Sequence, residues 1–96
     1  MELEAAVTKI QWQGLEVTIS FVMGWHLDYY CHIEIYCEER LPFTETGYRS
    51  HFTPMAKLDL YHGHIDFVIS WLNETAQSKA WNQYLEEAKQ LDLFDL

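Results

Sequence analysis

Apolar and polar residues alternate along much of the first half of the chain, which is the pattern of half-buried β-strands. The clearest run is residues 15–21, whose apolar members occupy every second position: Leu15, Val17, Ile19 and Phe21. A shorter run at residues 9–12 precedes it, and Gln13-Gly14 separates the two. Because a two-residue link ending in glycine suits a tight turn, these two runs predict a β-hairpin.

A third strand is predicted at residues 31–37, after a connection at residues 23–30. The apolar positions of this strand are Cys31, Ile33, Ile35 and Cys37. This register predicts that both thiols are buried and react slowly. Residues 41–54 contain two prolines and a glycine, so they predict a loop and a short fourth strand at residues 47–53.

The hydrophobic period lengthens in the second half of the chain, which indicates helices. Residues 64–72 carry a first apolar stripe, and a second stripe follows at Trp81, Tyr84, Leu85 and Ala88. Residues 73–75 either interrupt one helix or begin another. The predicted fold class is α+β: a small antiparallel sheet of three or four strands, with one or two C-terminal helices packed on its apolar face.

The length of 96 residues fits one domain that holds its core without disulfides or metals. We expect a single globular α+β domain over residues 1–89 and a docking tail over residues 90–96. The first residues do not resemble a signal peptide, and no run is long and apolar enough for a membrane span. We therefore expect a cytoplasmic protein with reduced cysteines and no membrane partner.

The charge is strongly acidic, with fifteen Asp and Glu against six Lys and Arg and a net charge of −9. Nucleic-acid-binding proteins carry a basic stripe that neutralises phosphates. The six basic residues are scattered, so we expect no direct contact with nucleic acid. If the protein works on DNA, it does so through another protein.

The histidines are candidate metal ligands. His62 and His64 are the closest pair, and on a strand they would share one face, with Asp66 or His51 as a third ligand. The other interpretation is a flexible linker before a helix. Because neither cysteine lies in a paired metal-binding motif, we expect no metal and no cofactor.

A hydrolase would need an exposed, activated thiol at Cys31 or Cys37, with His32 or His51 as its base. The strand alternation places both thiols on the apolar face instead. The sequence also has no glycine-rich phosphate loop, nucleophile elbow or zinc-protease motif. We therefore expect a protein that is not an enzyme.

The densest polar and aromatic cluster lies at residues 48–52. Tyr48, Arg49 and His51 form a possible recognition surface. The other interpretation is a sheet edge with ordinary cross-strand pairs. If the segment is a strand, Tyr48 lies on the face opposite to Arg49 and His51.

Residues 90–94 read Gln90-Leu91-Asp92-Leu93-Phe94. This string resembles the peptide with which bacterial proteins dock on the replicative sliding clamp, whose consensus is Gln-Leu-(Ser or Asp)-Leu-Phe. The resemblance implies that Leu93 and Phe94 fill the deep pocket of the clamp and that Gln90 fills a smaller second pocket. It leaves Asp92 as a spacer facing solvent. We expect such a peptide near a chain end to be free to leave the body of the protein.

A second resemblance rests on residues 44–52, Thr-Glu-Thr-Gly-Tyr-Arg-Ser-His-Phe. This stretch, followed by a helical second half, is similar to small uncharacterised proteins encoded on bacterial plasmids. The resemblance covers about residues 15–94 and implies a family without a known activity.

These observations predict a non-enzymatic binding protein that docks on the bacterial DNA polymerase sliding clamp. It would act as a replication or repair accessory, or as a mobile-element modulator of the clamp. The alternative is a small acidic phage or plasmid anti-defence protein, an inhibitor or decoy of a nucleic-acid-binding host protein. A decoy needs a dense acidic face, whereas clamp docking needs only a free tail.

Overall fold

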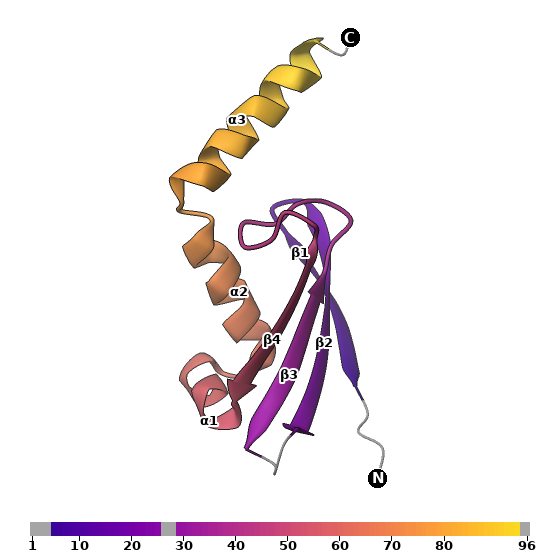
Figure 1. Ribbon diagram of the computed structural model, residues 1–96, viewed down its shortest axis with the longest axis vertical. Coiled ribbons are helices and arrows are strands. Elements are labelled where there is room, and N and C mark those ends of the chain that lie inside the picture. The colour runs from indigo at the N-terminus through magenta and orange to yellow at the C-terminus, as the bar shows by residue number, and fades with distance from the viewer. Residues whose placement is uncertain (1–4, 26–28, 95–96) are drawn as a thin grey trace.

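The computed structural model describes the backbone of residues 5–25 and 29–94, and the side chains of residues 5–23 and 29–89. Four antiparallel strands form one sheet in the order β1-β2-β3-β4, so each strand pairs with its neighbour in sequence (Figure 1). Their bounds are β1 Ala6–Trp12, β2 Leu15–Trp25, β3 Tyr30–Tyr36 and β4 Tyr48–Pro54.

The predicted hairpin joins β1 to β2. Gln13 and Gly14 form its two-residue link, with φ angles of 47° and 80°. Trp12 pairs with Leu15 across the link. Two consecutive positive φ angles match the right-handed twist of the paired strands, which is why glycine suits the second position. The hairpin prediction is confirmed.

β2 and β3 place their alternating apolar side chains on one face of the sheet. Ile19 pairs with Ile35, and Phe21 pairs with Ile33. β2 is longer than the sequence predicts, because it continues past residue 21 to Trp25 with an irregular register after Val22. The connection to β3 is correspondingly shorter than residues 23–30.

The second half of the chain is helical, as predicted. It contains α1 (Met55–Leu58), the short 3₁₀ helix η1 (Asp59–Tyr61), α2 (His64–Thr75) and α3 (Lys79–Phe94). The break between α2 and α3 falls just after residues 73–75. Ser78 accepts a hydrogen bond from the backbone N–H of Trp81 at 3.1 Å, which is the arrangement of a helix N-cap and favours the start of α3 at Lys79.

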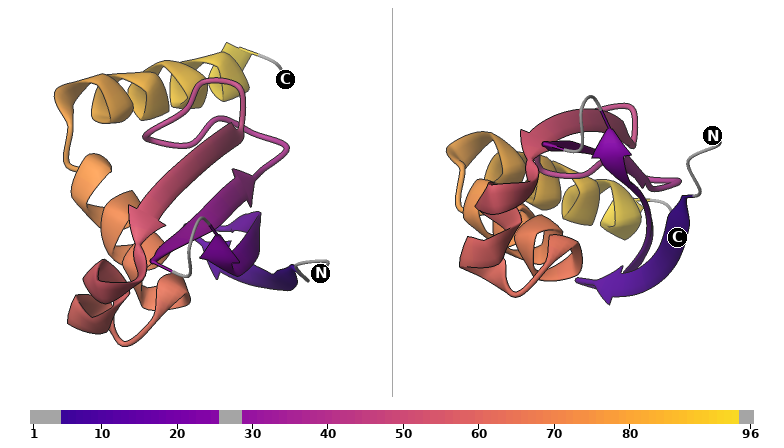
Figure 2. Two further views of the ribbon diagram at one scale, coloured as in Figure 1. Left: turned by 60° about the horizontal axis from the view of Figure 1, so that its bottom comes forward. Right: turned by 90° about the horizontal axis from the view of Figure 1, so that it is seen from below.

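Helices cover one face of the sheet and leave the other without a helix (Figure 2). The buried apolar residues between the two layers are Trp12, Val17, Ile19, Phe21, Cys31, Ile33, Ile35, Leu41, Leu58, Phe67, Val68, Leu72 and Trp81. Trp12 also joins the layers by a hydrogen bond, since its indole N–H donates to the side-chain oxygen of Asn73 at 2.8 Å. The α+β fold with C-terminal helices on one sheet face is confirmed.

α3 is anchored to the domain near its start. Trp81 is buried in the core, and Tyr84 packs against the core beneath the guanidinium of Arg40, 4.7 Å from the ring centre. Further along, α3 extends beyond the end of the sheet (Figure 1). The protein is correspondingly elongated, with extents of 53 × 24 × 18 Å. Within residues 5–25 and 29–94, no helix combines the length and apolar character needed to cross a membrane.

The two cysteines have different environments, and both are free thiols. Cys31 is fully buried in β3, as predicted, and its Sγ donates to the backbone oxygen of Thr53 at 3.5 Å. Cys37 lies just past the end of β3 and is only half-buried. The prediction that both thiols are buried is therefore wrong for Cys37, because the strand ends one residue before it.

Candidate functional site

The sheet face without helices carries a mixed polar and aromatic surface, which we call the open face. Its side chains come from all four strands and include Lys9, Glu16, Thr18, Ser20, Val22, His32, Glu34, Tyr36, Tyr48, Ser50 and Phe52. The register aligns them in rows across the sheet: Ser20 with Glu34 and Ser50, and Val22 with His32 and Phe52. Phe52 is 50% exposed, so large aromatic surface remains in contact with solvent.

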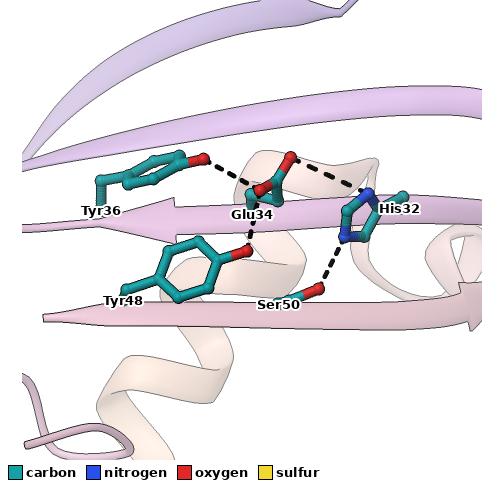
Figure 3. A network of polar contacts seen from close by, with 5 residues as sticks. All are labelled: His32, Glu34, Tyr36, Tyr48 and Ser50. Atoms are coloured by element: carbon teal, nitrogen blue, oxygen red, sulfur yellow. Dashed lines mark hydrogen bonds and ion pairs between the residues drawn. The ribbon is translucent and has the colours of Figure 1, made fainter. Parts of the chain in front are cut away.

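Glu34 lies at the centre of a hydrogen-bond network on the open face (Figure 3). Its Oε2 accepts hydrogen bonds from the hydroxyls of Tyr48 at 2.8 Å and Tyr36 at 2.9 Å. These bonds, that from Tyr48 first, lower the pKa of the Glu34 carboxyl. The same bonds raise the pKa of both tyrosine hydroxyls. At neutral pH the network is therefore a carboxylate held by two neutral phenols.

His32 extends this network toward Ser50. Its Nε2 lies 2.7 Å from Ser50 Oγ, and its Nδ1 lies 3.8 Å from Glu34 Oε1. The imidazole also stacks on Phe52, with ring centres 4.1 Å apart. These contacts hold His32 flat against the sheet, between β3 and the edge strand β4.

Ser50, His32 and Glu34 stand in the order of a nucleophile, a base and an orienting acid. The geometry does not complete that arrangement. The 3.8 Å separation between His32 and Glu34 exceeds hydrogen-bond distance. The other Glu34 oxygen is already taken by the two phenols. The arrangement therefore gives no support to a reactive serine and serves to fix side chains on the sheet surface.

A cavity of about 750 Å³ adjoins the network at the end of the sheet where the β1–β2 turn meets the β3–β4 loop. We call it the acidic cavity, and its charged and aromatic lining is Lys9, Glu16, Glu38, Glu39, Tyr36 and Tyr48. Lys9 and Glu16 form an ion pair at 3.5 Å. Gly47 closes the loop side, where its carbonyl accepts a hydrogen bond from the Cys37 N–H at 2.7 Å.

The structure does not bring the predicted recognition residues Tyr48, Arg49 and His51 onto one surface. Tyr48 lies on the open face, whereas Arg49 and His51 point to the helix side, as strand alternation requires. The ring centre of His51 lies 4.8 Å from that of Trp71 in α2, and the Arg49 guanidinium lies 5.5 Å from the same ring. Arg49 and His51 therefore join the sheet to α2 and are separate from the open face.

The histidine pair is also separated. His62 is exposed in the turn before α2, with a φ of 61°, whereas His64 begins α2 and stacks on Phe21 with ring centres 4.0 Å apart. The linker interpretation thus describes this segment better than a strand. Burial lowers the pKa of His64. Within the described residues, no three His, Cys, Asp or Glu side chains gather as they would around a metal ion. His26 lies outside those residues.

The predicted docking residues Gln90, Leu91, Asp92, Leu93 and Phe94 have a described backbone, which forms the last part of α3. Their side chains lie outside the described residues, as do residues 95 and 96 entirely. Clamp docking by this segment stays a prediction. What the fold adds is its position, on the part of α3 that extends beyond the sheet (Figure 1).

The residues that sequence reasoning missed are those that meet only across strands. Glu34 and Tyr36 were visible as the polar side of β3, but their connection to Tyr48 depends on the β3–β4 register. Glu38 and Glu39 are adjacent acids in the sequence, and no local pattern connects them to the two tyrosines. Polar and aromatic residues alternate on one side of both β3 and β4. This pattern was the sequence feature that could have indicated a solvent-exposed sheet face with a binding role.

Comparison with known families decides the relationship of this chain. The family model of the KlcB third domain matches residues 5–81, which span the whole sheet, α2 and the first turn of α3. The chain belongs to the KlcB third-domain family. This family is plasmid-associated. The KlcB third-domain match includes the open face and the acidic cavity, and it ends before residues 90–94. No curated protein and no solved structure matches the chain.

Proposed function

We propose that this protein is a non-enzymatic binding protein that docks on the bacterial DNA polymerase sliding clamp. The observation that carries the proposal is the sequence Gln90-Leu91-Asp92-Leu93-Phe94, which agrees with the clamp-docking consensus at all five positions. Leu93 and Phe94 are the expected anchors. Burying each of them in a preformed pocket contributes roughly 1.5–3 kcal/mol before the entropic costs of association.

The fold supports access to this segment. α3 is fixed to the domain by Trp81 and Tyr84, which precede Gln90 by about two turns of the helix. The helix then extends beyond the sheet (Figure 1). Helix ends open at low free-energy cost, so a partner that requires a different backbone conformation there meets little resistance. A clamp could hold this end without touching the sheet.

The charge and the family support a role on DNA that is indirect. A net charge of −9 opposes direct binding to DNA phosphates. Docking on the clamp, which encircles DNA, would bring the protein to DNA without such direct binding. The family is plasmid-associated, which fits a protein of a mobile element that modulates the host clamp or recruits it. The protein would act as a replication or repair accessory or as a competitor for the docking groove.

A pull-down from bacterial lysate tests the proposal. The bait is the intact protein, beside a version that lacks residues 90–96. We expect the sliding clamp among the proteins that the intact bait retains and not among those that the shortened bait retains. Equal recovery of the clamp on both baits, or its absence from both, would contradict docking through this segment.

A further inference from the structure

The acidic cavity has the size and position of a binding site. Its volume of about 750 Å³ lies within the range of 300–1,000 Å³ typical of ligand pockets. Its lining includes side chains of the open face: Lys9, Glu16, Thr18, Tyr36 and Tyr48. Strand ends on one side and the β3–β4 loop on the other form its walls, so the protein backbone there is held by the sheet ladder and by the Cys37–Gly47 hydrogen bond.

Two aromatic rings in the cavity are fixed before any ligand arrives. Tyr36 and Tyr48 lie side by side, with ring centres 5.1 Å apart and planes tilted by 45°. Both hydroxyls donate to Glu34, so neither ring is free to turn away (Figure 3). Each tyrosine nevertheless stays 43% exposed. Aromatic faces presented in this way attract cations through the ring quadrupole.

The charged side chains around the two rings also favour a cationic ligand. Three carboxylates line the cavity, those of Glu16, Glu38 and Glu39, against the single ammonium of Lys9. Lys9 is already paired with Glu16. Among the described residues, neither Glu38 nor Glu39 has an ion pair, so two carboxylates remain for an incoming cation. Their field also raises the rate at which positively charged molecules arrive.

We propose that the acidic cavity binds an arginine side chain from a basic segment of a partner protein. A guanidinium stacks on aromatic rings and forms paired hydrogen bonds with carboxylates, which an ammonium group does less well. The volume exceeds that of one side chain and leaves room for the peptide that carries it. Phosphate groups are repelled by the same carboxylates, so nucleic acid does not fit this site.

This site is independent of the clamp-docking segment. It lies on the sheet and the β3–β4 loop, whereas residues 90–94 belong to the far part of α3. A protein with both would have one contact for the clamp and another for a basic partner. Either proposal can fail without the other, because no residue is shared between them.

The test uses a short fluorescent peptide in which arginines alternate with glycines, titrated into the full chain at low salt and followed by anisotropy. The matched probe carries neutral citrulline in place of each arginine. We expect binding of the arginine peptide only, with amide NMR shifts centred on the acidic cavity. Equal binding of the citrulline peptide, or shifts centred elsewhere, would overturn the proposal.

Paired variants separate this site from general attraction to an acidic protein. Glu38→Gln/Glu39→Gln removes two carboxylates from the cavity, and Glu86→Gln/Glu87→Gln removes two exposed ones from α3. Both change the net charge equally. We expect about threefold to tenfold weaker binding for the cavity variant and a much smaller change for the helix variant. An equal loss in both would show attraction by net charge alone and would refute the site.

The aromatic contribution has its own control. Tyr48→Leu removes one ring from the cavity, whereas Tyr29→Leu removes a ring that is 72% exposed and lies outside it. We expect weaker binding of the arginine peptide only for Tyr48→Leu, with unchanged far-ultraviolet circular dichroism in both variants. Unchanged affinity of a folded Tyr48→Leu variant would exclude ring stacking as part of the site.

Discussion

Replacing Gly47 by alanine tests whether the β3–β4 loop depends on a close approach between backbone segments. Gly47 has a φ of 83°, a conformation that L-residues other than glycine rarely adopt. A Cβ on this residue would overlap the carbonyl oxygen of Cys37 and lie 3.1 Å from that of Glu39. Because both oxygens belong to the backbone, neither can move aside as the end of a flexible side chain would.

Gly14 supplies a matched control for the magnitude. Its φ is 80°, and a Cβ there would meet no atom within 4 Å. Gly14→Ala therefore measures the cost of the left-handed backbone alone, about 1–2 kcal/mol. Gly47→Ala carries the same cost and adds the overlap with Cys37. We expect its total loss of unfolding free energy to reach about 3–5 kcal/mol, the upper end for single substitutions.

Urea denaturation followed by tryptophan fluorescence measures both variants. The expected result is a clear difference between them, with Gly47→Ala less stable by at least about 1.5 kcal/mol. If the two variants lose the same stability, the loop is not held by the contact between Gly47 and Cys37. The close approach of Gly47 to Cys37 would then not be what holds the loop wall of the acidic cavity in place.

Two further predictions concern buried titratable groups. Stability should fall as the pH drops below about 6.5, because burial lowers the pKa of His64 and the unfolded chain therefore binds the proton first. Above that pH both states are neutral and this effect vanishes. His64→Phe, which preserves a ring against Phe21, should reduce the dependence without abolishing it, because burial also lowers the pKa of His51. An unchanged slope of stability against pH in His64→Phe would contradict the prediction. A thiol reagent should modify Cys37 well before Cys31, whose pKa is raised by burial. Single Cys→Ser variants assign the fast site, and equal rates would be inconsistent with the burial of Cys31.

Local sequence patterns predicted the fold well where one periodicity dominates. The alternation at residues 15–21 gave β2 its face, because one side of that strand must be buried. Gln13-Gly14 located the hairpin, since few residue pairs accept two positive φ angles. The limits of strands were harder to predict. Cys37 continues the apolar alternation of β3, and its N–H still bonds to the carbonyl of Gly47, which follows the β3–β4 register. The strand ends before Cys37 because Gly47 opposite it has a φ of 83°, which is not the extended backbone of a strand.

The candidate site could be predicted only in part. The polar side of β3 was visible, but the hydrogen bonds from two tyrosines to Glu34 arise from a register between strands that are separated by a long loop. The acidic cavity likewise joins the β1–β2 turn to residues 38–39 and 46–48, which no local pattern connects. Such sites depend on tertiary contacts between segments that are distant in the sequence.

The most direct test of the proposed function is a titration of a purified bacterial sliding clamp with three forms of the protein. These are the wild type, the double variant Leu93→Ala/Phe94→Ala, and Asp92→Ser, which keeps the docking consensus. We expect the wild type and Asp92→Ser to bind alike and the double variant to lose binding while its thermal melting is unchanged. If both side chains belonged to the core instead, the double substitution would cost about 5–10 kcal/mol of stability. Loss of stability together with no clamp binding by the wild type would contradict the proposed function.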